Sequence, residues 1–198
     1  RVTARDPVVA ADLARTAWTV LGHAQFELED FLRAEHAYQQ VLSFALPADH
    51  ADAIRERLAA SIYRQAEVHR DAGDPEAAVE DFLRVASVAP GSAIGATADY
   101  DAAATLIQLA RWDQAAEALR TFRQRYPDHE YADRVTRNLA AAYLESGNAA
   151  AAARELEAVA RNEAEPMDVR IDAAWQAARQ YEASAGPDAA IRLYAYLA

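Results

Sequence analysis

The residues of this chain that could carry out chemistry are few, and their spacing does not bring them together. The chain has no cysteine, which excludes disulfides, thiolate metal sites and a cysteine nucleophile. It contains no serine-nucleophile motif, HExxH motif or paired-carboxylate signature. No two of the five histidines stand four residues apart, as a metal site on one helix would need, and they are His23, His36, His50, His69 and His129. We therefore predict that the protein is not an enzyme and that it binds no metal or cofactor.

Three further classes of function are disfavoured by the sequence. A glycine- and serine-containing stretch at residues 91–95 lacks the preceding β-strand of a phosphate-binding loop, so we interpret it as a linker and helix N-cap. The formal net charge of −11 argues against nucleic-acid binding, because phosphates would be repelled. No apolar run approaches the roughly 20 residues that a membrane-spanning helix needs, which predicts no membrane insertion of this segment.

The chemistry that does recur in the sequence is that of recognition. Large aromatic residues recur along the chain at Tyr63, Tyr100 and Trp175. They occupy equivalent positions in three copies of the repeat described below. Arginines gather nearby in the second half of the chain, at Arg134, Arg137, Arg170 and Arg179. Tyrosine, tryptophan and arginine are the residues that dominate the energetics of protein interfaces. Whether they can act in this way depends on the elements that hold them.

Those elements follow one amphipathic helix pattern that occurs five times. In the third copy Ala115, Leu119 and Phe122 fall at i, i+4 and i+7 and form one apolar stripe, and Pro127 ends the helix. The other copies are Ala34/Tyr38/Val41, Ala78/Phe82/Val85, Ala152/Leu156/Val159 and Ala190/Tyr194/Leu197. Their alanines are spaced by 44, 37, 37 and 38 residues. This regularity predicts a helical repeat protein.

Each copy is preceded by another helix, so the chain divides into five antiparallel helix hairpins. Prolines, glycines and capping residues place the ten helices near residues 7–28, 31–45, 48–72, 75–89, 92–109, 112–126, 129–146, 148–162, 167–184 and 187–198. The repeats are expected at about residues 8–47, 48–91, 92–128, 129–166 and 167–198, as a single array over residues 1–198. Because the chain begins at Arg1 without an initiator methionine and ends inside an apolar helix, we expect a fragment of a longer chain.

A small residue recurs twelve positions before each repeated alanine. These residues are Gly22, Ala66, Ala103, Ala140 and Ala178. Small residues facing each other let two helix axes approach closely, so we expect the two small sets to meet inside each hairpin. Larger side chains are expected to fill the space beside them, namely Trp18, Leu21, Tyr143 and Tyr181.

This pattern of small, aromatic and small or aliphatic positions ending in proline resembles the tetratricopeptide repeat (TPR). The resemblance covers the chain from about Leu13 and implies an all-α fold, a right-handed superhelix of about five TPR-like hairpins (an α-α solenoid). The segment at residues 122–132 also resembles the F-x-x-x-Y-P-D-x-x-Y-A segment of bacterial envelope TPR proteins, such as the β-barrel assembly lipoprotein and the TolA-binding regulator. That resemblance implies a periplasmic or outer-membrane-associated scaffold, with a cytoplasmic location left open. The same Tyr-Pro-Asp turn also has a purely structural interpretation, in which Tyr126 packs on the preceding hairpin.

In TPR arrays the first helices line a concave groove. On each first helix, three residues should face this groove. They stand three positions before, one position after and four positions after the small residue of that helix. The predicted groove residues are Thr19, His23, Phe26, Tyr63, Glu67, Arg70, Tyr100, Ile107, Arg137, Leu144, Trp175 and Arg179. They could bind a peptide or partner helix, or they could pack against the first helix of the next repeat.

We predict a non-catalytic protein-interaction scaffold. Its partner is a protein or peptide, with an acidic segment or terminal carboxylate favoured by the arginines. An alternative is a cytoplasmic regulatory TPR module that senses a ligand or peptide and controls a partner enzyme or transcription factor. The last helix carries Leu193, Tyr194, Tyr196 and Leu197 with no following repeat, which predicts self-association through this end.

Overall fold

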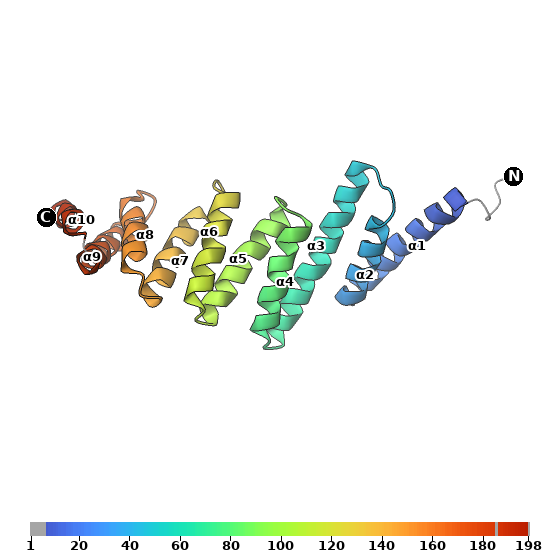
Figure 1. The fold of residues 1–198 in the computed structure, drawn as a ribbon, viewed down its shortest axis with the longest axis horizontal. Coiled ribbons are helices and arrows are strands. Elements are labelled where there is room, and N and C mark those ends of the chain that lie inside the picture. Colours follow the sequence, from blue (N-terminus) through green and yellow to red (C-terminus); the bar gives the residue numbers. More distant parts are fainter. Residues whose placement is uncertain (1–6, 185, 198) are drawn as a thin grey trace. The chain divides into compact units, whose positions relative to one another are not determined.

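The chain folds entirely into helical hairpins. The structure, a computed structural model, describes residues 7–184 and 186–197, with side chains for 8–184 and 186–195. Over these residues it contains ten α-helices and no strand (Figure 1). The helices are α1 (Pro7–Glu27), α2 (Phe31–Leu42), α3 (Ala48–Asp71), α4 (Pro75–Val88), α5 (Ala93–Gln108), α6 (Trp112–Arg125), α7 (Ala132–Glu145), α8 (Ala149–Arg161), α9 (Met167–Ala183) and α10 (Pro187–Leu197). The predicted all-α class is confirmed.

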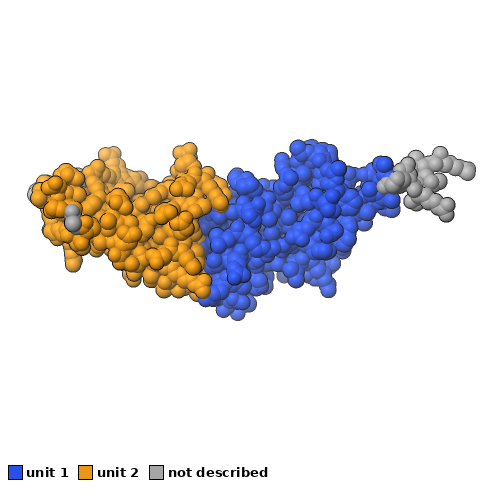
Figure 2. All heavy atoms as spheres, viewed as in Figure 1, with its two compact units in different colours: residues 1–102 blue, residues 103–198 orange. Residues whose placement is uncertain are grey.

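The helices fall into two compact units, residues 1–102 and residues 103–198 (Figure 2). The boundary lies inside α5. In the first unit α1 packs on α2, α2 on α3 and α3 on α4, and in the second unit the same order runs from α6 to α10. Within each unit these helices therefore pack on their neighbours in sequence, as repeats that stack one after another require. The division into five repeats stays a prediction.

The helices begin where the sequence supplies capping groups. Asp30, Asp74 and Asn148 each accept a hydrogen bond from the backbone N–H three residues on. Pro75 follows its cap directly, at a position where a missing N–H costs nothing. The predicted starts of α2, α4 and α8 are thus correct to within one residue. Asp6 stands directly before Pro7, where the sequence predicts the cap of α1, but it lies outside the described residues.

The turns inside four hairpins place one residue in the left-handed region. Gly73 and Gly147 do so with φ of 80° and 74°, as their predicted C-cap role requires. At the equivalent places the other hairpins use Glu29 (φ 60°) and Ala110 (φ 54°). A side chain at such a φ is strained, because Cβ crowds the following carbonyl oxygen.

Replacing Glu29 with glycine should therefore stabilise the protein. Relief of left-handed strain outweighs the extra freedom that glycine gives the unfolded chain, for a net gain of about 0.5–1 kcal/mol. Urea denaturation measures this gain as a higher midpoint. Gly73→Ala is the matched control and should lose about 1 kcal/mol. A lower midpoint for the Glu29 variant would refute strain at this turn.

Both predicted sets of small residues are buried, as close helix approach requires. They are Gly22, Ala66, Ala103, Ala140 and Ala178 on the first helices, and Ala34, Ala78, Ala115, Ala152 and Ala190 on the second. The approach is closest in the first hairpin, where a Cβ on Gly22 would lie 2.8 Å from Cε1 of the buried Tyr38 ring. One expectation is wrong: Leu21 does not fill the space beside Gly22 but is 40% exposed.

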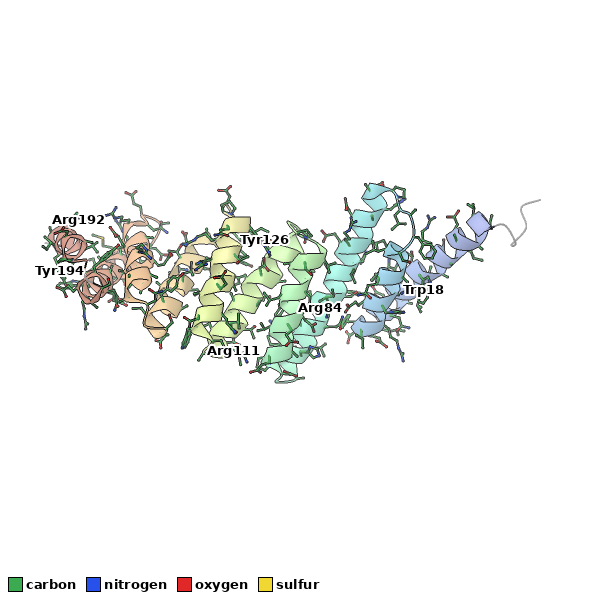
Figure 3. All side chains as sticks on the ribbon, viewed as in Figure 1. Trp18, Arg84, Arg111, Tyr126, Arg192 and Tyr194 are labelled. Carbon is green, nitrogen blue, oxygen red and sulfur yellow. The ribbon has the colours of Figure 1, made fainter. Side chains whose placement is uncertain are left out.

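Two helix boundaries differ from prediction. The second helix ends at Leu42 rather than near Ala45. Helix α7 begins at Ala132 rather than His129, because the residues before it form an aromatic cluster instead of a helical turn. The His129 ring lies 5.3 Å from that of Phe122 and 4.7 Å from that of Tyr131, measured between centroids. The ring centroid of Tyr126, which Figure 3 labels, lies 5.2 Å from that of Phe122, which supports the structural interpretation of the Tyr-Pro-Asp turn.

Candidate partner-binding site

A hollow lies between α1 and α3, the first helices of the first two hairpins, next to the predicted groove residue Thr19. Thr19 of α1 lines this hollow of about 260 Å³, and its hydroxyl donates to the Arg15 carbonyl oxygen (3.0 Å). The other wall comes from the first turns of α3, and residues of α2 and the following loop complete it. The lining residues are Arg15, Thr19, Val41, Leu46, His50, Ala53 and Ile54.

The chemistry of this hollow combines apolar contacts with two basic side chains. Val41 is buried, and Leu46 and Ile54 are half-buried. Arg15 makes an ion pair with Asp12 (3.2 Å), but a guanidinium has five N–H donors and can bind a second carboxylate. His50 is exposed and adds a further nitrogen. The hollow can therefore accept an apolar side chain that lies next to a carboxylate.

The remaining predicted residues of α1 differ in accessibility. His23 is exposed, with its ring centroid 5.8 Å from that of Tyr38. Phe26 is half-buried against Phe31, at a centroid distance of 5.3 Å. His23 is therefore accessible to a partner, whereas Phe26 mainly covers the hairpin core.

On α3 the predicted trio packs between neighbouring helices. The Tyr63 hydroxyl donates to Asp101 Oδ2 on α5 (2.6 Å), and its ring lies 5.3 Å from that of Phe82 on α4. Arg70 lies over the Phe82 ring at 5.7 Å, and Glu67 pairs with Arg70 at 3.8 Å. All three are half-buried, so they favour the packing alternative, with only their edges accessible to a partner.

Tyr100 on α5 fits the packing alternative still better, because its side chain is buried. Ile107 and Leu144 are half-buried in the second unit. Arg137 is exposed, yet its guanidinium binds Glu165. Within the described residues, three of the four predicted arginines are thus engaged, since Arg134 lies over the Tyr131 ring and Arg170 Nε donates to the Ala160 carbonyl oxygen.

Two further exposed residues of the predicted set lie on α9. Trp175 is 50% exposed, and its ring centroid lies 5.2 Å from that of Tyr194 on α10. Arg179 is exposed one turn further along. Trp175 occupies the same repeat position as Tyr63, and Tyr194 the same position as Phe82. The difference is that α5 covers Tyr63, whereas Trp175 lies open in the described structure.

Removal of the Trp175 side chain should therefore have little effect on stability. Trp175→Ala loses an aromatic contact that is half in water, which corresponds to about 1 kcal/mol. Thermal unfolding followed by circular dichroism measures this loss. Capture of a groove-bound partner should fall strongly in the same variant. A midpoint decrease of more than about 10 °C would mean a loss of several kcal/mol and would make Trp175 a packing residue.

A charged network fixes α3 against its neighbours and so holds the hollow's second wall in place. Glu35 on α2 and Asp81 on α4 are both buried. Arg84 on α4, labelled in Figure 3, binds Glu35 and also Asp81 (2.6 Å). From α3, Gln65 Nε2 donates to Glu35 Oε2 (2.7 Å), and His69 Nδ1 lies 2.9 Å from Asp81 Oδ2. Burial alone would lower the pKa of Arg84, but these carboxylates outweigh it and raise that pKa.

Two tyrosine hydroxyls also donate hydrogen bonds to carboxylates on other helices. Burial and the hydrogen bond that its hydroxyl donates to Glu157 (2.6 Å) raise the pKa of Tyr181 to about 12. Burial and the bond to Asp101 raise the pKa of Tyr63 as well. Both bonds join a first helix to a helix of an adjacent hairpin. They require a protonated hydroxyl.

Stability should therefore fall as pH rises from 10 to 12. An unfolded tyrosine loses its proton near pH 10, whereas Tyr181 keeps its proton to about pH 12 in the folded chain. Over this interval the folded state binds more protons, so rising pH favours unfolding. Urea midpoints measured from pH 9 to 12 should decline less steeply for Tyr181→Phe than for the parent chain. Parallel declines would mean that this tyrosine does not stabilise the fold.

The described residues contain no group of three or more histidine, aspartate or glutamate side chains placed to hold a metal ion. In the same residues, no helix is both long and apolar enough to cross a membrane.

The hairpins and their close-packed small residues define the class as an α-helical solenoid. Residues 97–129 match a family model described as tetratricopeptide repeat, and residues 16–46 match a second model with the same description. These two segments match the tetratricopeptide repeat, a type of repeat that generally mediates contacts between proteins. The two matches fall within the first repeat and largely within the third repeat expected from the sequence.

Among the similar solved structures, one with a TM-score above 0.5 supports the same fold. A protein described as a kinesin light chain from Podosopora anserina, with nearly identical TPR-like repeats, has a TM-score of 0.51 and 18% identity over 92% of both chains. BtubC from P. vanneervenii has a TM-score of 0.48 and 20% identity, covering 97% of this chain and 81% of that one. Pseudomonas aeruginosa pilF has a TM-score of 0.48 and 18% identity, covering 95% and 77%. A comparison with curated proteins gave no match.

Sequence reasoning identified Thr19 but missed the rest of the hollow. Arg15 and Thr19 stand four residues apart on one helix face, which the sequence does show. His50, Ala53 and Ile54 join them only because α3 starts with extra turns, and the wider spacing of 44 residues is the sign of those turns.

Proposed function

We propose that this chain is a non-catalytic scaffold that binds an extended peptide or partner helix along its first helices. The hollow between α1 and α3 carries this proposal, because it is concave, is lined largely by apolar side chains and includes the predicted groove residue Thr19. Peptide-binding grooves gain specificity from pockets that accept single side chains, and this hollow has the size for one.

The partner is proposed to present an apolar side chain next to an acidic group. Leu46 and Ile54 supply apolar contact, and Arg15 supplies the cation. The contact between Arg15 and a carboxylate is an ion pair near the surface, so its contribution to affinity should weaken with added salt. An acidic residue or a free terminal carboxylate would satisfy Arg15 equally.

A peptide library tests the proposal directly. Random peptides displayed with free C-termini are selected on the full chain and then titrated against two variants. Ala53→Trp fills the hollow, and Arg15→Gln removes the cation. We expect selected peptides that combine an apolar and an acidic group, with at least tenfold weaker binding to each variant. Leu83→Glu, on the exposed side of α4, is the matched control and should bind normally. Equal binding to all four proteins would refute the site.

We further propose that the scaffold works in a bacterial envelope assembly or export system. The Tyr-Pro-Asp segment at residues 122–132 supports this setting through its resemblance to envelope TPR proteins. Fractionation of the native host with an antibody against this chain is the direct test. Recovery in the periplasm or with the outer membrane supports the proposal, and recovery only with cytoplasmic proteins would refute it.

Self-association through the last helix is also proposed, but with different residues from those expected. Leu193 is buried against α9 rather than exposed, so it is not part of an open apolar end. Tyr194 is half-buried. The side chains of Tyr196 and Leu197 lie outside those described. The large apolar residue that α10 does expose is Ile191.

A further inference from the structure

A second hollow, of about 480 Å³, lies between the turn that joins α1 to α2 and the C-terminal end of α3. Pockets that bind ligands commonly enclose about 300–1,000 Å³, and this hollow falls in that range. It shares no lining residue with the hollow at Thr19. On α3 the first hollow reaches Ala53 and the second reaches Val68, a separation of about 22 Å along the helix. The two hollows are therefore separate sites of the first unit.

Three exposed apolar side chains meet in this second hollow. Leu28, Leu32 and Val68 all line it, although 74%, 67% and 52% of their respective surfaces are accessible to water. A single exposed leucine needs no explanation, because much of any protein surface is apolar. Large apolar side chains that gather in one concavity are instead typical of binding sites. The hollow can therefore take an apolar side chain of a partner.

The repeat pattern does not account for the apolar character of this surface. Leu32 stands two positions before the repeated alanine of its hairpin. The three hairpins with a neighbour on each side also expose this position, and their residues there are Glu76, Asp113 and Ala150. An acidic residue suits the first turn of a helix, whereas an exposed leucine gains nothing there from folding. Val68, in the second hairpin, is likewise open although its equivalents in the next two hairpins are buried, namely Thr105 and Ala142.

The polar side chains of the hollow offer hydrogen-bond acceptors. Glu29 is exposed, and its carboxylate makes no ion pair or hydrogen bond with another residue that the structure describes. Gln65 uses its amide Nε2 on Glu35, which leaves its carbonyl Oε1 as an acceptor. His69 Nδ1 lies 2.9 Å from a carboxylate oxygen of Asp81. Because a carboxylate only accepts, Nδ1 carries the proton, and Nε2 of the neutral ring is an acceptor.

The charge around the hollow favours a cation. Two carboxylates line it, those of Glu29 and Asp30, and no arginine does. Asp30 pairs with the exposed Arg33 (3.2 Å), so Glu29 is the carboxylate that remains for a partner. Residues 1–102 hold 17 acidic residues against 9 arginines, and most of the net charge of −11 therefore lies in this unit. Such a field attracts a cationic partner and repels an acidic one.

We propose that this hollow is a second binding site, which takes a basic peptide segment. An apolar side chain of the segment inserts among Leu28, Leu32 and Val68, and a neighbouring lysine or arginine pairs with Glu29. Donors of the segment can also reach the acceptor atoms of Gln65 and His69. The charged network around Arg84 holds these two side chains in place before binding, which lowers the cost of ordering them.

Selection on a chain whose first hollow is blocked tests this site by itself. Random displayed peptides are selected on the full chain carrying Ala53→Trp, which fills the hollow at Thr19. A second selection on Arg15→Gln, which removes only the cation of that hollow, covers the case in which the tryptophan disturbs the fold. We expect recovered peptides to combine a large apolar residue with lysine or arginine, and to bind the parent chain equally well. Failure of the acidic-peptide site at Thr19 would leave this result unchanged.

Two variants then remove the two parts of the site. Leu32→Gln removes apolar contact at a position where other hairpins carry polar residues, and it should weaken binding roughly tenfold or more. Glu29→Gln removes an exposed charge and should weaken binding roughly two- to fivefold. The matched controls lie in the second unit: Met167→Gln changes an apolar side chain of similar exposure, and Glu163→Gln changes an exposed carboxylate. Both controls should bind like the parent chain.

One combination of results supports the proposal: basic and apolar peptides, weaker binding to both site variants and unchanged binding to both controls. Every other result overturns it. Recovery of no peptide, or of peptides without a basic residue, excludes a site for basic segments. Equal affinity for the parent chain and either site variant shows that the peptides bind elsewhere or do not use that part of the hollow. Equal weakening by Glu29→Gln and Glu163→Gln shows only general attraction to an acidic chain.

Discussion

Replacing Ala115 with arginine should unfold the protein at much milder conditions than the parent chain requires. Ala115 is completely buried on α6, at the position where every hairpin carries an alanine. A guanidinium there must displace packed neighbours and leaves a cation without water or a counter-ion. Overpacking and charge burial together should cost about 3 kcal/mol or more. For a domain of this size that corresponds to a midpoint lower by about 6–12 °C.

The neighbouring residue supplies the control for this prediction. Gln114 lies on the same helix and is exposed, and arginine and glutamine have similar helix propensities. Gln114→Arg should therefore change the free energy of unfolding by less than about 0.5 kcal/mol. Equal midpoints for the two variants, measured by thermal and urea unfolding, would mean that Ala115 is not enclosed between helices and that the repeat assignment is wrong.

Replacing Arg84 with methionine should be the second most damaging change. Methionine keeps much of the side-chain volume but leaves the buried carboxylates of Glu35 and Asp81 without their shared cation. Breaking a fully buried pair costs about 3–5 kcal/mol, and half of the Arg84 side chain is exposed, so we expect a loss of about 2–4 kcal/mol. Urea denaturation measures this loss.

Two comparisons separate the network from ordinary surface charge. Arg120 pairs with Glu117 at 2.8 Å in the same i, i+3 arrangement, but both side chains are largely exposed. Arg120→Met should cost less than about 1 kcal/mol. Adding Glu35→Gln to the Arg84→Met variant should recover part of the lost stability, because it removes one unpaired charge. Similar losses for Arg84→Met and Arg120→Met would show that the network contributes little.

The fold could be predicted from sequence because it depends on local and repeated features. A buried alanine and a small residue twelve positions earlier need no long-range information, and caps such as Asp74 act on their own helix. The misplaced boundary before α7 shows the limit of this reasoning. Residues 129–131 follow a helix-start pattern, but in the structure the His129 ring packs against Phe122 and Tyr131 and the helix begins only at Ala132.

The candidate site was less predictable, because each groove position depends on what the next repeat places against it. Tyr63 and Trp175 occupy one repeat position, yet only Tyr63 meets a carboxylate from the following first helix. The hollow at Thr19 likewise depends on the extra turns at the start of α3 and on the loop that carries Leu46. Periodicity locates such positions on a helix face but does not reveal their neighbours across the interface.

Hydrogen exchange with a selected peptide bound tests the central claim most directly. If the chain is a peptide-binding scaffold, backbone amides around Arg15–Thr19 on α1 and His50–Ile54 on α3 should exchange more slowly in the complex, and this protection should disappear in Ala53→Trp. Protection confined to the outer helices α4, α6 and α8, with α1 and α3 unchanged, would contradict a binding site on the first helices.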